Sequence, residues 1–146
     1  MAYDVQQLLT MSKEQLDDLF KASPAGDIPS GEAKGTAIVA PGTVYSEPIA
    51  QMINVFGWQG KVFDANKGVL KNKVLFFGLE AIVAKVYKGE SWLDGKECIV
   101  LDYSETSLVA KWIRDEIRLI GPGFYLGKVY WGKDRLIDFC LQFPAA

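Results

Sequence analysis

The chain has 146 residues, of which 49% are apolar and 23% are charged, as expected for a single globular domain that needs no disulfide or metal to fold. Its formal net charge is −2 and its basic residues are scattered, so we expect no nucleic-acid-binding surface. It contains no histidine, which excludes Ser-His-Asp triads, Cys-His pairs and haem held by a proximal histidine. Two cysteines alone cannot supply the four ligands of a zinc site, so we predict neither a metal nor a cofactor.

The sequence carries no recognisable targeting or membrane signal. Residues 1–10 lack the basic segment and apolar core of a signal peptide, and no apolar run reaches the ~18 residues of a membrane span. Cys98 and Cys140 lie inside apolar runs, which is typical of small buried side chains, and whether they pair stays open. We predict a soluble, cytoplasmic protein of a bacterial type.

Two helices and one helical turn are expected before residue 57. Ser12 and Gln15 match a capping box, and the apolar residues that follow share one helical face, which predicts a helix over residues 12–21. A turn of helix over residues 5–9 is expected before it. Residues 47–56 also have helical spacing and end at a glycine.

Strand signals dominate the rest of the chain. Residues 23–35 are rich in Pro, Gly and Ser and predict a loop, and residues 36–40 predict a short strand. After residue 57 the apolar period changes to two, with a turn expected at residues 88–90, a hairpin signal at Asp94-Gly95 and a short helical excursion over residues 106–112. The expected strands are 59–63, 69–77, 79–87, 96–103, 113–120, 124–131 and 135–143.

These elements predict a mainly β fold, namely a small antiparallel β-barrel of seven to eight strands with N-terminal helices. We expect one domain over residues 1–146. Residues 57–143 would form the barrel, and the helical and loop residues 1–56 would pack on it.

The most unusual segment is a run of charges in one predicted strand. Strand alternation places Asp115 on one face and Arg114, Glu116 and Arg118 on the other. The plain interpretation is a solvated surface with weak ion pairs. The alternative is that one of these faces lines the barrel interior, where arginine would bind a carboxylate or phosphate and a carboxylate would act as a base. The sequence leaves open which face points inward.

Further polar candidates lie near strand ends. Asp102 and Tyr103 end an apolar strand, so they are either ordinary turn residues or groups at the mouth of the barrel. Tyr125 is a second candidate acid or hydrogen-bond donor. Asp94 is expected to do no more than form its turn. The four tryptophans are interpreted mainly as core residues, with a minority free to form the wall of a ligand pocket.

One segment resembles a known family. Residues 58–63, Trp-Gln-Gly-Lys-Val-Phe, are similar to the Trp-x-Gly-Lys-x-Phe segment of the uncharacterised GXWXG-type domain proteins. Asp102-Tyr103, Arg114, Leu126-Gly127 and Phe139-x-Leu141 follow in a similar order, so the resemblance covers roughly residues 57–143. It implies a lipocalin-like (calycin-like) small barrel that could hold an apolar ligand. Trp58 and Lys61 therefore join the candidate ligand-binding residues.

Three functions are compatible with this sequence. The first is a protein that binds a hydrophobic or amphipathic small molecule inside the barrel, as a monomer or a homodimer. Its polar anchors would be Arg114, Arg118, Asp102 and Tyr103.

The second is a small barrel enzyme, a cyclase or isomerase, with Asp102, Asp115 or Glu116 as base and Tyr103 or Tyr125 as acid. The third is a barrel filled by its own side chains that acts as an interaction module.

Overall fold

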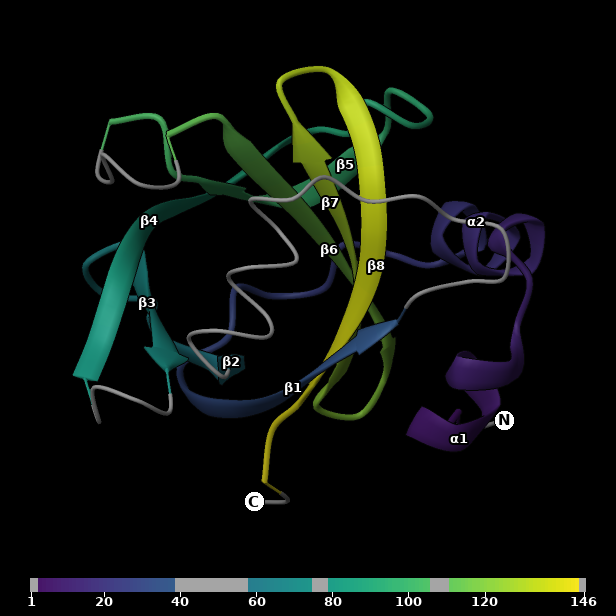
Figure 1. Ribbon diagram of the computed structural model, residues 1–146, viewed down its shortest axis with the longest axis horizontal. Helices are drawn as coiled ribbons and strands as arrows, with labels where there is room; N and C mark the ends of the chain where they lie inside the picture. Colours follow the sequence, from purple (N-terminus) through teal and green to yellow (C-terminus); the bar gives the residue numbers. More distant parts are fainter. Residues whose placement is uncertain (1–2, 39–57, 75–78, 106–110, 145–146) are drawn as a thin grey trace.

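The structure is a computed structural model that describes residues 3–38, 58–74, 79–105 and 111–144. Within these ranges, eight antiparallel strands pair in sequence order and close into a barrel, with the first strand pairing with the last (Figure 1). This confirms the predicted fold class. The strands are β1 (Gly31–Ile38), β2 (Trp58–Asp64), β3 (Val69–Val74), β4 (Leu79–Glu90), β5 (Glu97–Asp102), β6 (Ile113–Gly121), β7 (Phe124–Trp131) and β8 (Asp134–Gln142).

Two short helices, α1 (Val5–Thr10) and α2 (Lys13–Ala22), lie outside the barrel (Figure 1). Each begins at a capping box, with Asp4 before α1 and the predicted Ser12–Gln15 pair before α2. α2 is also held by charge, because its Asp17 accepts hydrogen bonds from Lys128 and Arg135 at 2.6–2.8 Å. Helix packing and ion pairs therefore fix α2 on the outer wall.

Strand alternation divides the core into two layers. The interior layer is apolar, and the outer layer lies between the helices and the strands. The interior side chains include Ala33, Phe63, Leu70, Ala84, Val86, Ile99, Leu101, Ile113, Ile117, Val129, Ile137, Phe139 and Leu141. The outer layer includes Leu8, Leu16, Phe20, Ile38, Cys98, Val100, Ile120, Phe124, Leu126 and Cys140. Both cysteines are thus buried free thiols of the outer layer.

Three local predictions differ from the structure. The loop expected over residues 23–35 ends earlier, because β1 already begins at Gly31 and pairs with both β2 and β8. The barrel therefore includes a strand that lies before the expected barrel range of 57–143. The turn expected at residues 88–90 is wrong, since β4 continues to Glu90 and the hairpin turns over residues 91–96. The predicted helix 47–56 and most of the excursion at 106–112 lie outside the described residues.

Gly60 of β2 pairs with Lys34 of β1. Its φ is +150°, and a Cβ at this position would lie 2.0 Å from the backbone oxygen of Ala33. Backbone cannot move aside without separating the two strands, so Gly60→Ala is expected to lower the free energy of unfolding by about 2–4 kcal/mol. Gly132→Ala is the control, because Gly132 also has a positive φ but a Cβ there would have no atom within 4 Å, so the loss should be about 1 kcal/mol. Urea denaturation of both variants checks this, and equal losses would contradict it.

In the described part of the chain, no helix is long and apolar enough to cross a membrane.

Candidate functional site

Four polar side chains meet inside the otherwise apolar barrel. Lys61 of β2, Asn72 of β3 and Asp115 of β6 all point inward by strand alternation, and Tyr103 directly follows β5. All four residues are nearly completely buried, with relative exposures of 1–3%. We call this group the interior polar cluster. It brings together three of the residues singled out from the sequence, namely Lys61, Tyr103 and Asp115.

The cluster is closely hydrogen-bonded. Lys61 Nζ lies 2.7 Å from Asn72 Oδ1, 2.7 Å from the Tyr103 hydroxyl and 3.2 Å from Asp115 Oδ2. The Tyr103 hydroxyl also accepts from Asn72 Nδ2 at 2.9 Å and donates to Asp115 Oδ2 at 3.2 Å. The Lys61 ammonium further lies 5.4 Å from the centre of the Phe139 ring, within cation–π range. Each group is therefore held in one orientation.

One oxygen of the cluster lacks a hydrogen-bond donor among the described residues. Asp115 Oδ1 is buried, and no described residue donates a hydrogen bond to it. A buried carboxylate oxygen without a donor costs free energy, so such atoms in folded proteins usually have a specific reason. The interior polar cluster thus presents one acceptor oxygen that a hydrogen-bond donor would stabilise.

Burial also changes the acidity of the cluster. Desolvation raises the pKa of Asp115, and the attraction of Lys61 opposes this. Desolvation lowers the pKa of Lys61, and Asp115 opposes that change in turn. Burial, together with the charge of Asp115, raises the pKa of Tyr103 well above its usual value. The pKa values of Lys61 and Asp115 are therefore shifted towards each other, which favours exchange of a proton between the two side chains.

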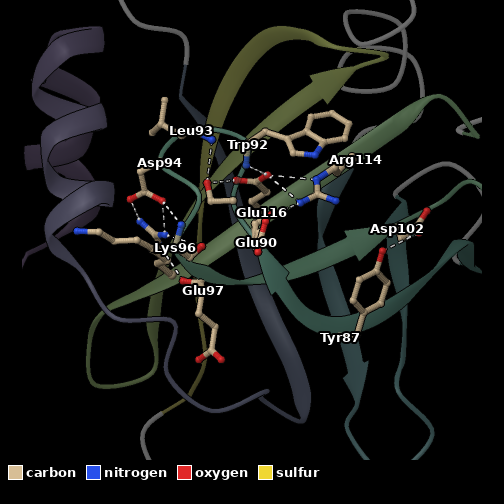
Figure 2. Close-up of polar contacts among 12 residues, drawn as sticks. Tyr87, Glu90, Trp92, Leu93, Asp94, Lys96, Glu97, Asp102, Arg114 and Glu116 are labelled. Atoms are coloured by element: carbon tan, nitrogen blue, oxygen red, sulfur yellow. Dashed lines mark hydrogen bonds and ion pairs between the residues drawn. The ribbon is translucent and has the colours of Figure 1, made fainter.

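The other charges of β6 lie on the opposite face. Arg114, Glu116 and Arg118 point outward, so the prediction that Arg114 and Arg118 anchor a ligand in the interior is wrong. Arg114 donates to Glu116 at 3.1 Å (Figure 2). Arg118 donates to Asp94 at 2.7 and 2.8 Å. The alternation itself was predicted, and closure of the barrel decides that Asp115 is on the inner side.

The remaining candidates are dispersed. Asp102 accepts from Tyr87 on the outer surface (Figure 2), and it also accepts from Ser104. Partial burial raises the pKa of Asp102, but the hydrogen bonds from Ser104 and Tyr87 and the charge of Arg114 together outweigh this and lower it. The Tyr125 hydroxyl donates to the backbone oxygen of Asp27, and burial raises its pKa. Neither residue joins the interior polar cluster. Trp58 begins β2, but its side chain lies outside the described residues.

Two structural contributors were not predicted. Asn72 has the sequence context Lys-Asn-Lys, which is typical of an exposed strand, and its partner Tyr103 is 31 residues away. Asp94 was expected only to form a turn, yet it also binds Arg118 and so ties the β4–β5 hairpin to β6. The two-residue alternation of a strand could have indicated that Asn72 shares a face with Leu70. No pattern in the residues near Asp94 indicates its contact with Arg118.

The Asp94–Arg118 pair should make stability pH-dependent. The hydrogen bonds from Arg118 lower the pKa of Asp94 from 3.8 to about 2. This stabilisation is present above pH 3.8 and is lost as the pH falls towards 2. Asp94→Asn should lower the free energy of unfolding by about 1.5–3 kcal/mol at neutral pH. The difference between wild type and variant, measured by urea denaturation, should shrink as the pH falls through this window, and a constant difference would contradict the assignment.

The described residues offer no group of three or more cysteine, aspartate or glutamate side chains that could hold a metal ion. What the interior polar cluster can do is donate and accept hydrogen bonds, balance one charge, and move a proton between Asp115, Tyr103 and Lys61.

Comparison with known proteins supports the fold. No family model and no curated protein matches the chain. A solved structure, described as the crystal structure of a protein from Thermomonospora curvata, superposes with a TM-score of 0.68 at 15% identity, over 93% of this chain and 90% of the other. At that identity the similarity shows a shared fold and says nothing of activity.

Proposed function

We propose that the barrel binds a small amphipathic molecule whose polar end contacts the interior polar cluster and whose apolar part lies against the interior side chains. An eight-stranded barrel is just wide enough inside to be filled by side chains or to hold one small ligand. The observation that carries the proposal is the buried Asp115 Oδ1, which lacks a donor from any described residue.

The cluster also limits the chemistry of the ligand. Lys61 and Asp115 balance each other in charge at 3.2 Å, so a charged ligand would bring an uncompensated charge into a buried site. A neutral hydroxyl or amide would instead donate to Asp115 Oδ1 without that penalty. We therefore expect a neutral head group with at least one donor. The resemblance to GXWXG-type domain proteins and a cytoplasmic location are compatible with this proposal and stay predictions.

Two measurements test binding. The purified protein is extracted with organic solvent and the extract analysed by mass spectrometry, and the protein is separately titrated with N-phenylnaphthylamine, an apolar dye that carries one N–H donor. The expected result is a co-purifying amphipathic compound, or saturable dye binding that the extracted compound displaces. Lys61→Met/Asp115→Leu should abolish this binding, and Lys88→Ala on the outer surface should not.

A protein that carries no compound and binds no dye would overturn the proposal and favour the filled-barrel interaction module. Equal dye binding by the wild type and by the Lys61→Met/Asp115→Leu variant would also overturn it, because the cluster would then have no part in binding.

A second candidate function is catalysis of the cyclase or isomerase kind. It is favoured by one observation, the opposite pKa shifts of the adjacent Lys61 and Asp115 beside the Tyr103 hydroxyl. An enzyme of this kind would exchange a C–H proton of the captured compound. In deuterated water, the wild-type protein should then incorporate deuterium into that compound, and Asp115→Asn should not. If neither protein incorporates deuterium, catalysis is excluded and only the binding proposal stands.

A further inference from the structure

A second candidate site lies on the outer wall of the barrel, independent of the interior polar cluster. Two hairpins, β4–β5 and β7–β8, border a shallow hollow of about 620 Å³ that is widely open to solvent. Small-molecule sites typically span about 300–1,000 Å³. We call it the Trp92 hollow; it is lined by Trp92, Leu93, Tyr130, Lys133, Asp134 and Arg135.

Trp92 is both exposed and firmly held. Its backbone N–H donates to Glu116 Oε2 at 2.8 Å, and the Arg114 guanidinium packs on its ring with Cζ 4.3 Å from the ring centre (Figure 2). Tyr130 meets the same ring edge-on at 5.2 Å. Even so, half of Trp92 remains exposed, at 50%.

This support is costly. Glu116 is completely buried, and its carboxylate is held by Ser91, the Trp92 backbone and Arg114. A buried carboxylate used to fix an exposed aromatic ring produces a preorganised contact surface, and preorganisation reduces the entropy lost when a ligand binds.

The rim of the hollow carries charges of both signs. Lys133 and Asp134 are exposed and adjacent, and both terminal nitrogens of Arg135 already bind Asp17 at 2.6–2.8 Å. Asp134 would repel an anion and Lys133 would repel a cation, so the rim favours neither kind of charged ligand. A neutral molecule with several hydroxyls can donate to Asp134 and accept from Lys133 at once.

The floor adds one more group. Tyr130 is 3% exposed, and no described residue hydrogen-bonds to its hydroxyl. The hydroxyl is itself buried, so Tyr130 contributes to the floor of the hollow through its ring, which packs against Trp92. The open side, however, would leave a wholly apolar ligand in contact with water, whereas apolar sites usually enclose most of the ligand. The occupant should therefore have one apolar face for the Trp92 ring and hydroxyls around its edge.

From these features we infer that the Trp92 hollow binds a sugar ring, stacked on Trp92 and hydrogen-bonded by Lys133 and Asp134. This inference does not depend on ligand binding inside the barrel.

Heteronuclear NMR of the indole N–H signals tests the inference. The chain has four tryptophans, so at most four indole N–H signals are expected, and the signal missing in Trp92→Phe is that of Trp92. Titration with methyl glucoside, N-acetylglucosamine and maltose should shift the Trp92 signal saturably with at least one of them. Asp134→Ala should weaken that binding about tenfold, as expected for the loss of a hydrogen bond. Trp112→Phe is the matched control, because Trp112 is 59% exposed but does not line the hollow, so this variant should bind sugar normally.

The inference fails if none of the three sugars shifts the Trp92 signal. It also fails if benzoate or phenylalanine, each carrying full charges, shifts that signal more strongly than the sugars do. Dye binding inside the barrel should be unchanged in Trp92→Phe, so loss of either site can be told from loss of the other.

Discussion

Arg118→Ala is expected to lower the free energy of unfolding by about 3–5 kcal/mol, the range for removing one partner of a buried ion pair. The Arg118 side chain is 1% exposed and donates to Asp94 through both terminal nitrogens. It also donates to the backbone oxygens of Phe20, Glu97 and Lys96, at 2.9, 3.1 and 3.2 Å. Its removal leaves one carboxylate and three carbonyls without these donors, and it removes the Arg118 contacts that link α2 and the β4–β5 hairpin to β6.

Urea denaturation followed by circular dichroism measures this loss. Arg118→Lys should recover only part of it, because an ammonium cannot reproduce the planar fork that binds Asp94. Lys88→Ala is the control. Lys88 forms a surface pair with Glu97 at 3.7 Å, so the change there should be within about 0.5 kcal/mol. If Arg118→Ala lowers the free energy of unfolding by no more than Lys88→Ala does, the hydrogen bonds of Arg118 contribute little to stability.

The second large effect concerns the interior polar cluster. Lys61→Met is expected to lower the free energy of unfolding by about 3–5 kcal/mol, because it leaves the Asp115 carboxylate buried without its counter-charge. Asp115→Leu should cost a similar amount for the converse reason. Lys61→Met/Asp115→Leu removes both charges, and buried pairs replaced by apolar side chains are often neutral in stability, so most of the loss should be recovered.

This double variant separates folding from function. In the wild type Asn72 Nδ2 donates to the Tyr103 hydroxyl at 2.9 Å, and we expect this hydrogen bond to remain in the double variant. If the double variant loses as much free energy of unfolding as the two single variants together, the cluster is required for folding. Loss of dye binding in that variant would then be no evidence that the cluster contacts a ligand. Recovery of stability together with loss of dye binding is the expected outcome.

The sequence was sufficient to predict the architecture because strand period and turn residues are local signals. The capping box at Ser12, the Asp94-Gly95 hairpin and the alternation in β6 all rest on residues within a few positions of one another. The alternation separated Asp115 from Arg114 and Arg118 correctly.

The interior polar cluster could not be predicted in full, because its contacts depend on barrel closure. Lys61 and Tyr103 are 42 residues apart, and no local pattern indicates that they meet. Which face of β6 points inward follows from how the sheet curves and from which face α2 covers. For the same reason the sequence did not show which of the four tryptophans lie outside the core, and the structure leaves half of Trp92 exposed beside Arg114 and Tyr130.

The measurement that most directly tests ligand binding at the cluster is competition against N-phenylnaphthylamine by dodecanol and by dodecanoate, which share a chain length and differ in the head group. We expect dodecanol, which is neutral and donates one hydrogen bond, to displace the dye at lower concentration than dodecanoate does. This preference should disappear in Lys61→Met/Asp115→Leu. Preferential displacement by dodecanoate, or the same preference in both proteins, would contradict the claim that Asp115 Oδ1 accepts a hydrogen bond from the ligand.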